Sequence, residues 1–221
     1  MPIDAEAINK AIKKVRDTTK KRKFKQSIDM SINLKDLDMS KPESKINLEV
    51  VLPKPVPKQV KICALAYGEM VLKAKQAGAD KIVEREEIEK LGGDKKKAKK
   101  LASQYDFFIA RSDLMPLIGK NLGPVLGPRG KMPTPMAPNA DPAPVIQRLR
   151  HVVRIKLSRS PTAAVRVGTE DMKDAEIAEN MQKVIDELTG KLERGDRNIK
   201  SVYIKTTMGS PVKLETGRRS Q

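Results

Sequence analysis

The chain has 221 residues, of which 38% are hydrophobic and 3% aromatic, and its formal net charge at pH 7 is +17. This length suits one large domain or two ordinary ones, and the charge predicts attraction to polyanions, with nucleic acid the leading candidate and a membrane surface a weaker one. The sequence has no apolar run of about 18 residues, no apolar secretory stretch at its start and a single cysteine, so we expect no membrane span, no internal disulfide and a reducing cytoplasm.

Basic residues are concentrated in three segments. Residues 1–25 and 91–131 each hold nine Lys or Arg and three acids, and residues 147–166 hold six basic residues and no acid. The acids gather in residues 80–90 and 170–193. This segregation favours basic binding faces, although any one cluster could also be a solvated lysine-rich helix.

The first quarter of the chain changes its periodicity. Asp4 is a candidate N-cap for a helix whose apolar stripe is Ile8, Ile12 and Val15. Apolar residues then alternate with polar ones over residues 28–34 and again over 46–52. These patterns predict two half-buried strands, which we expect to pair antiparallel with one wet face. The segment PKPVPK, residues 53–58, predicts a stiff extended connector.

The middle of the chain follows a different pattern. The runs VKICALA and DFFIA are continuously apolar, and helical patterns separate them. Short buried strands between helices are typical of a parallel sheet that is covered on both faces. A last helix begins near Pro144, a residue that suits a first turn.

Half-wet strands return after Arg154, in RIKLSR and AAVRVG. A long amphipathic helix and a strand–turn–strand segment, residues 198–215, follow; the apolar stripe of the helix is Ile177, Met181, Val184, Ile185 and Leu188. The two ends of the chain therefore share one pattern of half-buried strands and amphipathic helices. We predict a discontinuous α+β domain from residues 1–57 and 154–221, with helices on one face of an antiparallel sheet, and an inserted three-layer α/β/α, Rossmann-like domain from residues 58–153, with a hinge at the two crossings.

The stretch GKNLGPVLGPRGKMPTPMAP, residues 119–138, does not match a phosphate-binding loop. Val125 and Met132 stand where a Walker motif ending at Lys131 needs Gly and Ser or Thr, and the G-x-G-x-x-G pattern is also missing. Its glycines permit unusual backbone angles and its basic residues, Lys120, Arg129 and Lys131, can meet phosphates. We expect an ordered contact loop.

The sequence offers no catalytic or metal-binding constellation. His151 is the only histidine and Cys63 lies in an apolar run. We therefore expect no enzyme activity, no metal and no cofactor, with His151 on a basic face and Cys63 in the core.

Two stretches near the chain ends indicate a nucleic-acid contact instead. KRKFKQS places Phe24 among basic residues just before a strand, and KTTMGSPVKL places residues 206–209 at a break between strands. Hydroxyls, a glycine and an apolar Met can lie against a nucleic-acid backbone. The alternatives are an ordinary hairpin turn for TTMG and a core position for Phe24.

Three motifs resemble the ribosomal large-subunit L-one family, in its archaeal form. LGPVLGPRGKMPTP is similar to that family's LGxxLGPRGxMPxP motif, SVYIKTTMGSPVKL to its closing signature, and KQVKICALAYGE to the opening of its middle domain. The resemblance covers almost the whole chain in order. One departure is Ser210-Pro211, which reverses the Pro-Ser order of bacterial members.

The resemblance implies a split domain, an inserted domain and a hinge between them. It implies a free monomer that joins the large ribosomal subunit, binds rRNA at the mobile stalk near the tRNA exit site, assists release of deacylated tRNA, and represses translation by binding its own mRNA. On matching positions, the implied rRNA-binding residues are Lys23, Phe24, Arg166, Val167, Gly168, Thr206, Thr207, Met208 and Gly209. A lesser RNA contact is implied in the middle domain, at Lys120, Arg129, Gly130 and Lys131.

Two alternatives belong to other functional classes. A general nucleic-acid-coating protein would bind any duplex through charge alone, with one common salt dependence. An enzyme of the inserted domain would act on a phosphorylated small molecule, and it would bind mononucleotides.

Overall fold

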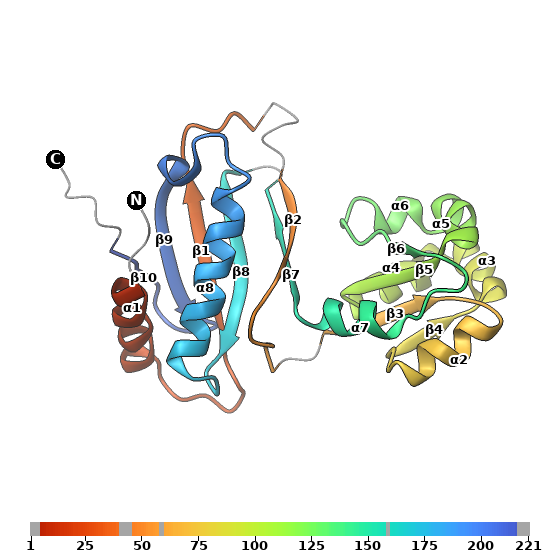
Figure 1. Cartoon of the computed structure of the whole chain (residues 1–221), viewed down its shortest axis with the longest axis horizontal. Helices are drawn as coiled ribbons and strands as arrows, with labels where there is room; N and C mark the ends of the chain where they lie inside the picture. Colours follow the sequence, from red (N-terminus) through yellow and green to blue (C-terminus); the bar gives the residue numbers. More distant parts are fainter. Residues whose placement is uncertain (1–4, 40–45, 58–59, 158–159, 216–221) are drawn as a thin grey trace. The chain divides into compact units, whose positions relative to one another are not determined.

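The computed structural model describes residues 5–39, 46–57, 60–157 and 160–215. The chain divides into two compact units, a terminal unit of residues 1–58 and 151–221 and an inserted unit of residues 59–150 (Figure 1). Val152 and Val153, which we had assigned to the insertion, lie in strand β7 (Val152–Lys156). They pair there with β2 (Asn47–Val51), so they belong to the terminal unit.

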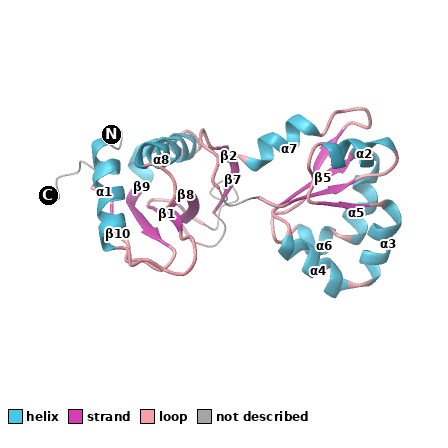
Figure 2. Cartoon of the chain, turned by 90° about the horizontal axis from the view of Figure 1, so that it is seen from below, coloured by secondary structure: helices cyan, strands magenta, loops and turns pink. Residues whose placement is uncertain are grey.

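The terminal unit contains a four-stranded antiparallel sheet in the order β10-β9-β1-β8. Its central strand β1 alternates strictly, with Ile28, Met30, Ile32 and Leu34 buried on one face. Helices α1 and α8 cover that face, and no helix in the described part of the terminal unit covers the other (Figure 2). The strands are β1 (Ser27–Leu34), β8 (Thr162–Thr169), β9 (Ile199–Thr206) and β10 (Val212–Lys213), and a short 3-10 helix, Gly195–Asn198, precedes β9.

The two helices bury the stripes that their periodicity predicts. Helix α1 (Ala5–Thr18) packs through Ile8, Ile12 and Val15, and α8 (Asp174–Thr189) packs through the five apolar residues named above. The N-cap expected at Asp4 lies outside the described residues. No helix in the described part of the chain is long and apolar enough to cross a membrane.

The expected pairing of the first two strands is wrong. β1 bonds to β8 along one edge and to β9 along the other, while β2 forms a separate two-stranded antiparallel sheet with β7. Alternation determines which face of a strand is buried but does not select its neighbour. Here both edges of β1 are taken by strands from the far end of the chain.

The connector that follows β2 is held to the terminal unit at its start. The Leu52 amide donates to the His151 carbonyl (2.9 Å). The Lys54 amide donates to Asn180 Oδ1 (3.0 Å), and Asn180 Nδ2 donates back to the Lys54 carbonyl (3.1 Å). The buried amide of Asn180 therefore fixes the chain to α8 as far as Lys54.

The inserted unit is a parallel sheet between two helical layers, which confirms the predicted fold class. Its strand order is β4-β3-β5-β6, with helices α3 to α6 on one face and α2 and α7 on the other (Figure 1). The strands are β3 (Ile62–Leu65), β4 (Lys81–Val83), β5 (Phe107–Arg111) and β6 (Thr134–Met136). The helices are α2 (Glu69–Gln76), α3 (Arg85–Gly93), α4 (Lys95–Gln104), α5 (Met115–Asn121), α6 (Gly123–Leu126) and α7 (Ala143–Arg150), with a 3-10 turn at Ser112–Leu114.

The proline-rich stretch is more regular than its sequence indicates. Gly123 begins helix α6, and Gly127 is its C-cap with a helical φ of −57°. Of the three glycines in LGPVLGPRG, Gly130 alone has a positive φ, 67°. Pro135 lies within an edge strand, β6, where a missing amide donor is tolerated.

Candidate nucleic-acid interface

The link between α1 and β1 lies at one end of the terminal unit (Figure 1), and its sequence is a run of cations. Residues 20–25 are all exposed, and all of them except Phe24 are Lys or Arg. Phe24 is 50% exposed, so it is not the core residue that we considered as an alternative. An exposed aromatic ring among cations can contact a nucleotide while its neighbours meet phosphates.

Gln26 joins this link to two other segments. It is fully buried, its amide donates to Glu170 Oε1 (3.1 Å) and its Nε2 donates to the Lys20 carbonyl (3.2 Å). Its Oε1 accepts from the Met208 amide (3.2 Å). Gln26 therefore holds together three segments: its backbone amide bonds to the loop after β8, and its side chain joins the basic link to the turn after β9. The sequence analysis missed Gln26 because a neutral residue beside a basic run carries no pattern of its own.

The TTMG turn, residues 206–209, divides its side chains between inside and outside. Thr206 is 1% exposed and its Oγ1 lies 3.1 Å from Thr19 Oγ1. The Thr207 amide donates to the Ser27 carbonyl (3.0 Å), and Thr207 Oγ1 accepts from the Ser27 amide (3.1 Å). Met208 is 61% exposed. The turn therefore presents Met208 outward, while Thr206 anchors it from behind.

Gly209 is required by space in this turn. A Cβ at this position would lie 2.2 Å from Thr206 Oγ1 and 3.3 Å from Thr19 Oγ1. The Gly209 amide donates to the Thr206 carbonyl (3.1 Å), which closes the turn. Any side chain here would push apart the hydroxyl pair that anchors Met208.

Val167 and Gly168 lie at the same end of the unit but are buried. The Val167 carbonyl accepts from Asn180 Nδ2 (2.9 Å), and a Cβ on Gly168 would lie 3.0 Å from Ile177 Cγ1. These two residues let α8 approach β8 closely. Their side of the strand faces the helix, so they support the surface rather than form it.

Arg166 belongs to the helix-free face of the sheet. It is in register with Asp29, whose other neighbour is Lys205. Arg166 Nε is buried and has no hydrogen-bond partner among the residues that the structure describes. Arg166 is therefore brought near the β1 end of the surface, but on a different face from Gly168.

The acids that border the basic link are engaged with it. Lys25 Nζ lies 2.7 Å from Asp171 Oδ2, and this hydrogen bond raises the pKa of Lys25. Arg16 donates to the carbonyls of Glu170 and Met172 and lies 2.6 Å from Asp174. These contacts fix the loop after β8 against α1.

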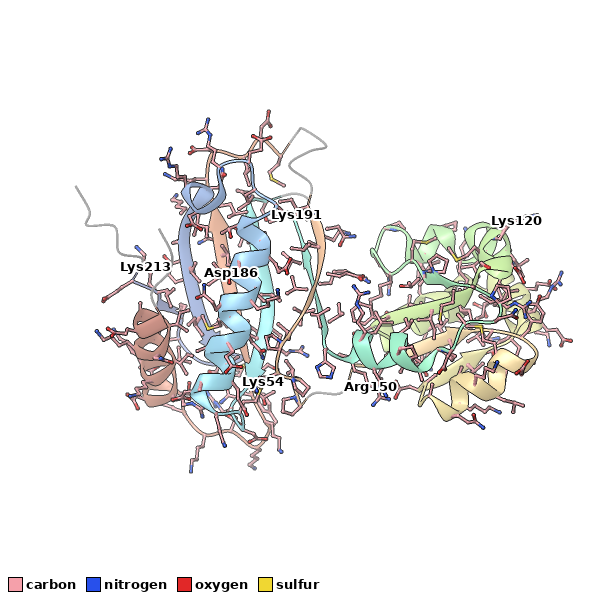
Figure 3. All side chains as sticks on the ribbon, viewed as in Figure 1. Lys54, Lys120, Arg150, Asp186, Lys191 and Lys213 are labelled. Carbon is pink, nitrogen blue, oxygen red and sulfur yellow. The ribbon has the colours of Figure 1, made fainter. Side chains whose placement is uncertain are left out.

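The predicted secondary RNA contact is arranged differently. Arg129 Nη1 donates to Ser103 Oγ (2.8 Å), and Lys131 Nζ donates to the carbonyls of Ala102 (3.0 Å) and Tyr105 (2.7 Å). Lys131 thus serves the C-terminal end of α4, whose last carbonyls need donors, while Arg129 bonds to a side chain of the same turn. Lys120 is exposed, and it is labelled on the outside of the inserted unit in Figure 3.

Ligands of open α/β sheets commonly bind where the strand order reverses, which here is beyond the ends of β3 and β5. Tyr67, Arg111 and Asp113 occupy that place. Asp113 Oδ2 accepts from Arg111 Nε (2.9 Å) and from the Tyr67 hydroxyl (3.3 Å), and the Arg111 guanidinium lies 4.2 Å from the Tyr67 ring centre. The three groups satisfy one another.

Cys63 is buried as expected, and burial raises the pKa of its thiol to about 12.

Comparison with known proteins gives one consistent result. The Ribosomal protein L1p/L10e family matches residues 12–210. "Large ribosomal subunit protein uL1" of Methanothermobacter thermautotrophicus is 46% identical over 209 residues, covering 95% of this chain and 99% of that protein. The protein of the same name from Pyrococcus abyssi is 45% identical over 216 residues, covering 97% and 98%. The one from Pyrobaculum calidifontis is 46% identical over 213 residues, covering 96% and 95%.

Proposed function

The chain belongs to the ribosomal protein L1p/L10e family, and from this premise we propose that it binds large-subunit rRNA through the end of the terminal unit that carries Phe24 and Met208. It is a structural protein of the large ribosomal subunit and not an enzyme. The observation that carries the proposal is the joint presentation of these two exposed apolar side chains by segments that Gln26 ties together.

The binding mechanism follows from this arrangement. Lys and Arg of the link neutralise phosphates, which supplies salt-dependent affinity for any nucleic acid. Phe24, Thr207 and Met208 lie on segments fixed by hydrogen bonds, so they fit one RNA shape and reject others. The buried residues Thr206, Val167 and Gly168, together with the half-buried Gly209, hold that shape. In this mechanism charge gives affinity, and the rigid turn gives selectivity.

The family further suggests that the rRNA region is the mobile stalk near the tRNA exit site and that the inserted unit moves as deacylated tRNA leaves. It also suggests binding to the protein's own mRNA. The two chain crossings are the natural hinge, and the Lys54–Asn180 bonds limit the first one to the residues beyond Lys54. A cysteine pair, one in each unit of a Cys63→Ala protein, joined by a bifunctional reagent, should slow tRNA release from ribosomes. Unchanged release would disprove the hinge.

The decisive experiment is a titration of the full chain against a stalk-type rRNA fragment, a scrambled duplex and a DNA duplex at two salt concentrations. We expect the fragment to bind at least tenfold more tightly than either duplex. Phe24→Ala should weaken fragment binding about tenfold without changing the salt slope, because the ring is uncharged. Lys23→Ala should lower the slope by about one. Equal binding of all three ligands would instead establish a coating protein that relies on charge.

A further inference from the structure

A cavity of about 410 Å³ opens beside the proposed rRNA surface, within the terminal unit. Its walls come from the end of α1, from Lys21 and Arg22 of the basic link, and from Glu170 and Asp171 of the loop after β8. Its volume falls within the range of about 300–1,000 Å³ that small-molecule sites occupy. None of the residues implied by the family resemblance, apart from Thr206, lines it.

Part of the cavity wall is already committed to the fold. Arg16 is bonded to two carbonyls and paired with Asp174. Glu170 Oε1 accepts from the Gln26 amide, and Asp171 Oδ2 is paired with Lys25. These contacts leave one carboxylate oxygen on each of the two acids without a hydrogen bond or an ion pair to any described residue.

The cations at the cavity are free to bind a ligand. Lys21 and Arg22 are exposed and make no hydrogen bond or ion pair within the described part of the chain. The cavity thus joins two anion-binding groups to two hydrogen-bond acceptors of negative charge. A ligand that satisfies both sets carries a phosphate together with N–H donors.

The floor of the cavity is formed by Ile28 and Thr206. Ile28 is 1% exposed, so only a small part of its side chain borders the cavity. Thr19 Oγ1 donates to the Val15 carbonyl (2.5 Å), so in its contact with Thr206 the Thr206 hydroxyl is the donor. Thr206 is followed directly by Thr207 and Met208, which places the cavity beside the turn that the RNA would contact.

We propose that this cavity binds one unpaired guanine nucleotide of the RNA, with the carboxylates of Glu170 and Asp171 accepting from the N1–H and N2–H of the base and with Lys21 and Arg22 binding its phosphates. Among the four bases, guanine alone presents two adjacent donors on its pairing edge, and a base in a pocket is read through that edge. The inference rests on the proposed function because the nucleotide belongs to the rRNA that is bound at the TTMG turn.

The first test uses the full chain and 5′-mononucleotides, followed by chemical-shift changes and calorimetry. GMP should bind at least fivefold more tightly than AMP, CMP or UMP, and shifts should centre on residues 19–22 and 170–171. Glu170→Gln keeps an acceptor for the Gln26 amide but removes the charge, and it should weaken GMP binding about tenfold. Glu69→Gln, on an exposed acid of the inserted unit, is the matched control and should change nothing.

The second test separates the cavity from the rRNA surface. Inosine, which lacks the N2 amino group, replaces each unpaired guanosine of the stalk-type fragment in turn. Inosine at one of these positions should lower the affinity of the wild type for the fragment about tenfold. The same replacement should leave the affinity of Glu170→Gln unchanged. If the wild type binds the fragment but no position and no mononucleotide depends on Glu170, the cavity proposal is overturned and the rRNA surface stands. If GMP binding depends on Glu170 but the fragment does not bind, the assignment to rRNA is overturned for both the cavity and the surface.

Discussion

Two loops of this molecule look alike in sequence and behave differently in structure. LGPVLGPRGKM and TTMGSP both combine glycine, proline and an exposed methionine, and both are followed or preceded by cations. In the first, Arg129 and Lys131 donate to groups of α4. In the second, the inward bonds are made by neutral hydroxyls and amides, and Met208 faces solvent.

The difference lies in what each loop leaves available for a ligand. A cation whose donors already satisfy a helix end has lost much of its capacity for phosphate. A loop that is anchored by neutral groups keeps its neighbouring cations available. The hydrogen-bond partners of each cation therefore indicate better than the composition of the loop whether the cation is available to bind phosphate.

The largest difference between the loops is expected when one substitution is made in each. Met208→Asp places a carboxylate on the proposed rRNA surface, and we expect fragment affinity to fall by tenfold to a hundredfold, which corresponds to about 1–3 kcal/mol. Met132→Asp, at a methionine that is 42% exposed in the inserted unit, should change affinity less than twofold. Equal losses measured in the same titration would remove the distinction between the two loops.

Glycine substitutions extend the comparison to stability. Gly209→Ala should destabilise the terminal unit by about 1–3 kcal/mol, because its Cβ would lie 2.2 Å from Thr206 Oγ1. Gly119→Ala, in helix α5 with no atom within 4 Å of the new Cβ, should be neutral or slightly stabilising. Denaturant unfolding measures both. In a Thr206→Ala background the cost of Gly209→Ala should shrink, and an unchanged cost would show that the hydroxyl is not the obstacle.

The sequence predicts local structure better than it predicts partners. The stripes of α1 and α8 and the alternation of β1 are correct because each is set by burial of one face. The predicted pairing of β1 with β2 is wrong because the alternation of apolar residues does not determine which strands lie next to each other. Strand β6 was missed because Pro135 interrupts its pattern.

The residues of the proposed site divide in the same way between those that the sequence singles out and those that it does not. Phe24 and Met208 stand out as apolar residues in polar stretches, and both are exposed. The burial of Thr206 and Gly168, the inward bonds of Lys131 and the linking role of Gln26 depend on contacts between segments far apart in the chain. No local pattern carries such contacts.

The cation at Lys131 tests the structural role of the first loop. Lys131→Met removes two charge-assisted bonds to the carbonyls of Ala102 and Tyr105, so the inserted unit should lose about 1–2 kcal/mol of stability. Lys120→Met, on an exposed helical lysine, is the matched control and should lose little. Fragment affinity should differ less than threefold between the two variants. A selective loss of affinity in Lys131→Met, without a loss of stability, would return that loop to the RNA contact.

The smallest effect uses Cys63, the only cysteine of the chain, as a reporter of the inserted unit. Burial raises the pKa of its thiol from 9.0 to about 12, so the folded unit keeps a proton that the unfolded chain loses as pH rises between these values. The stability that the buried protonated thiol contributes is complete below pH 9 and is lost as pH rises to 12. The difference in unfolding free energy between wild type and Cys63→Ala should therefore fall by about 1 kcal/mol between pH 8 and pH 10. Thiol labelling under native conditions should be accelerated by Lys131→Met and not by Gly209→Ala. Acceleration by both would mean that the two units open together, and the contrast between their loops could then not be measured one unit at a time.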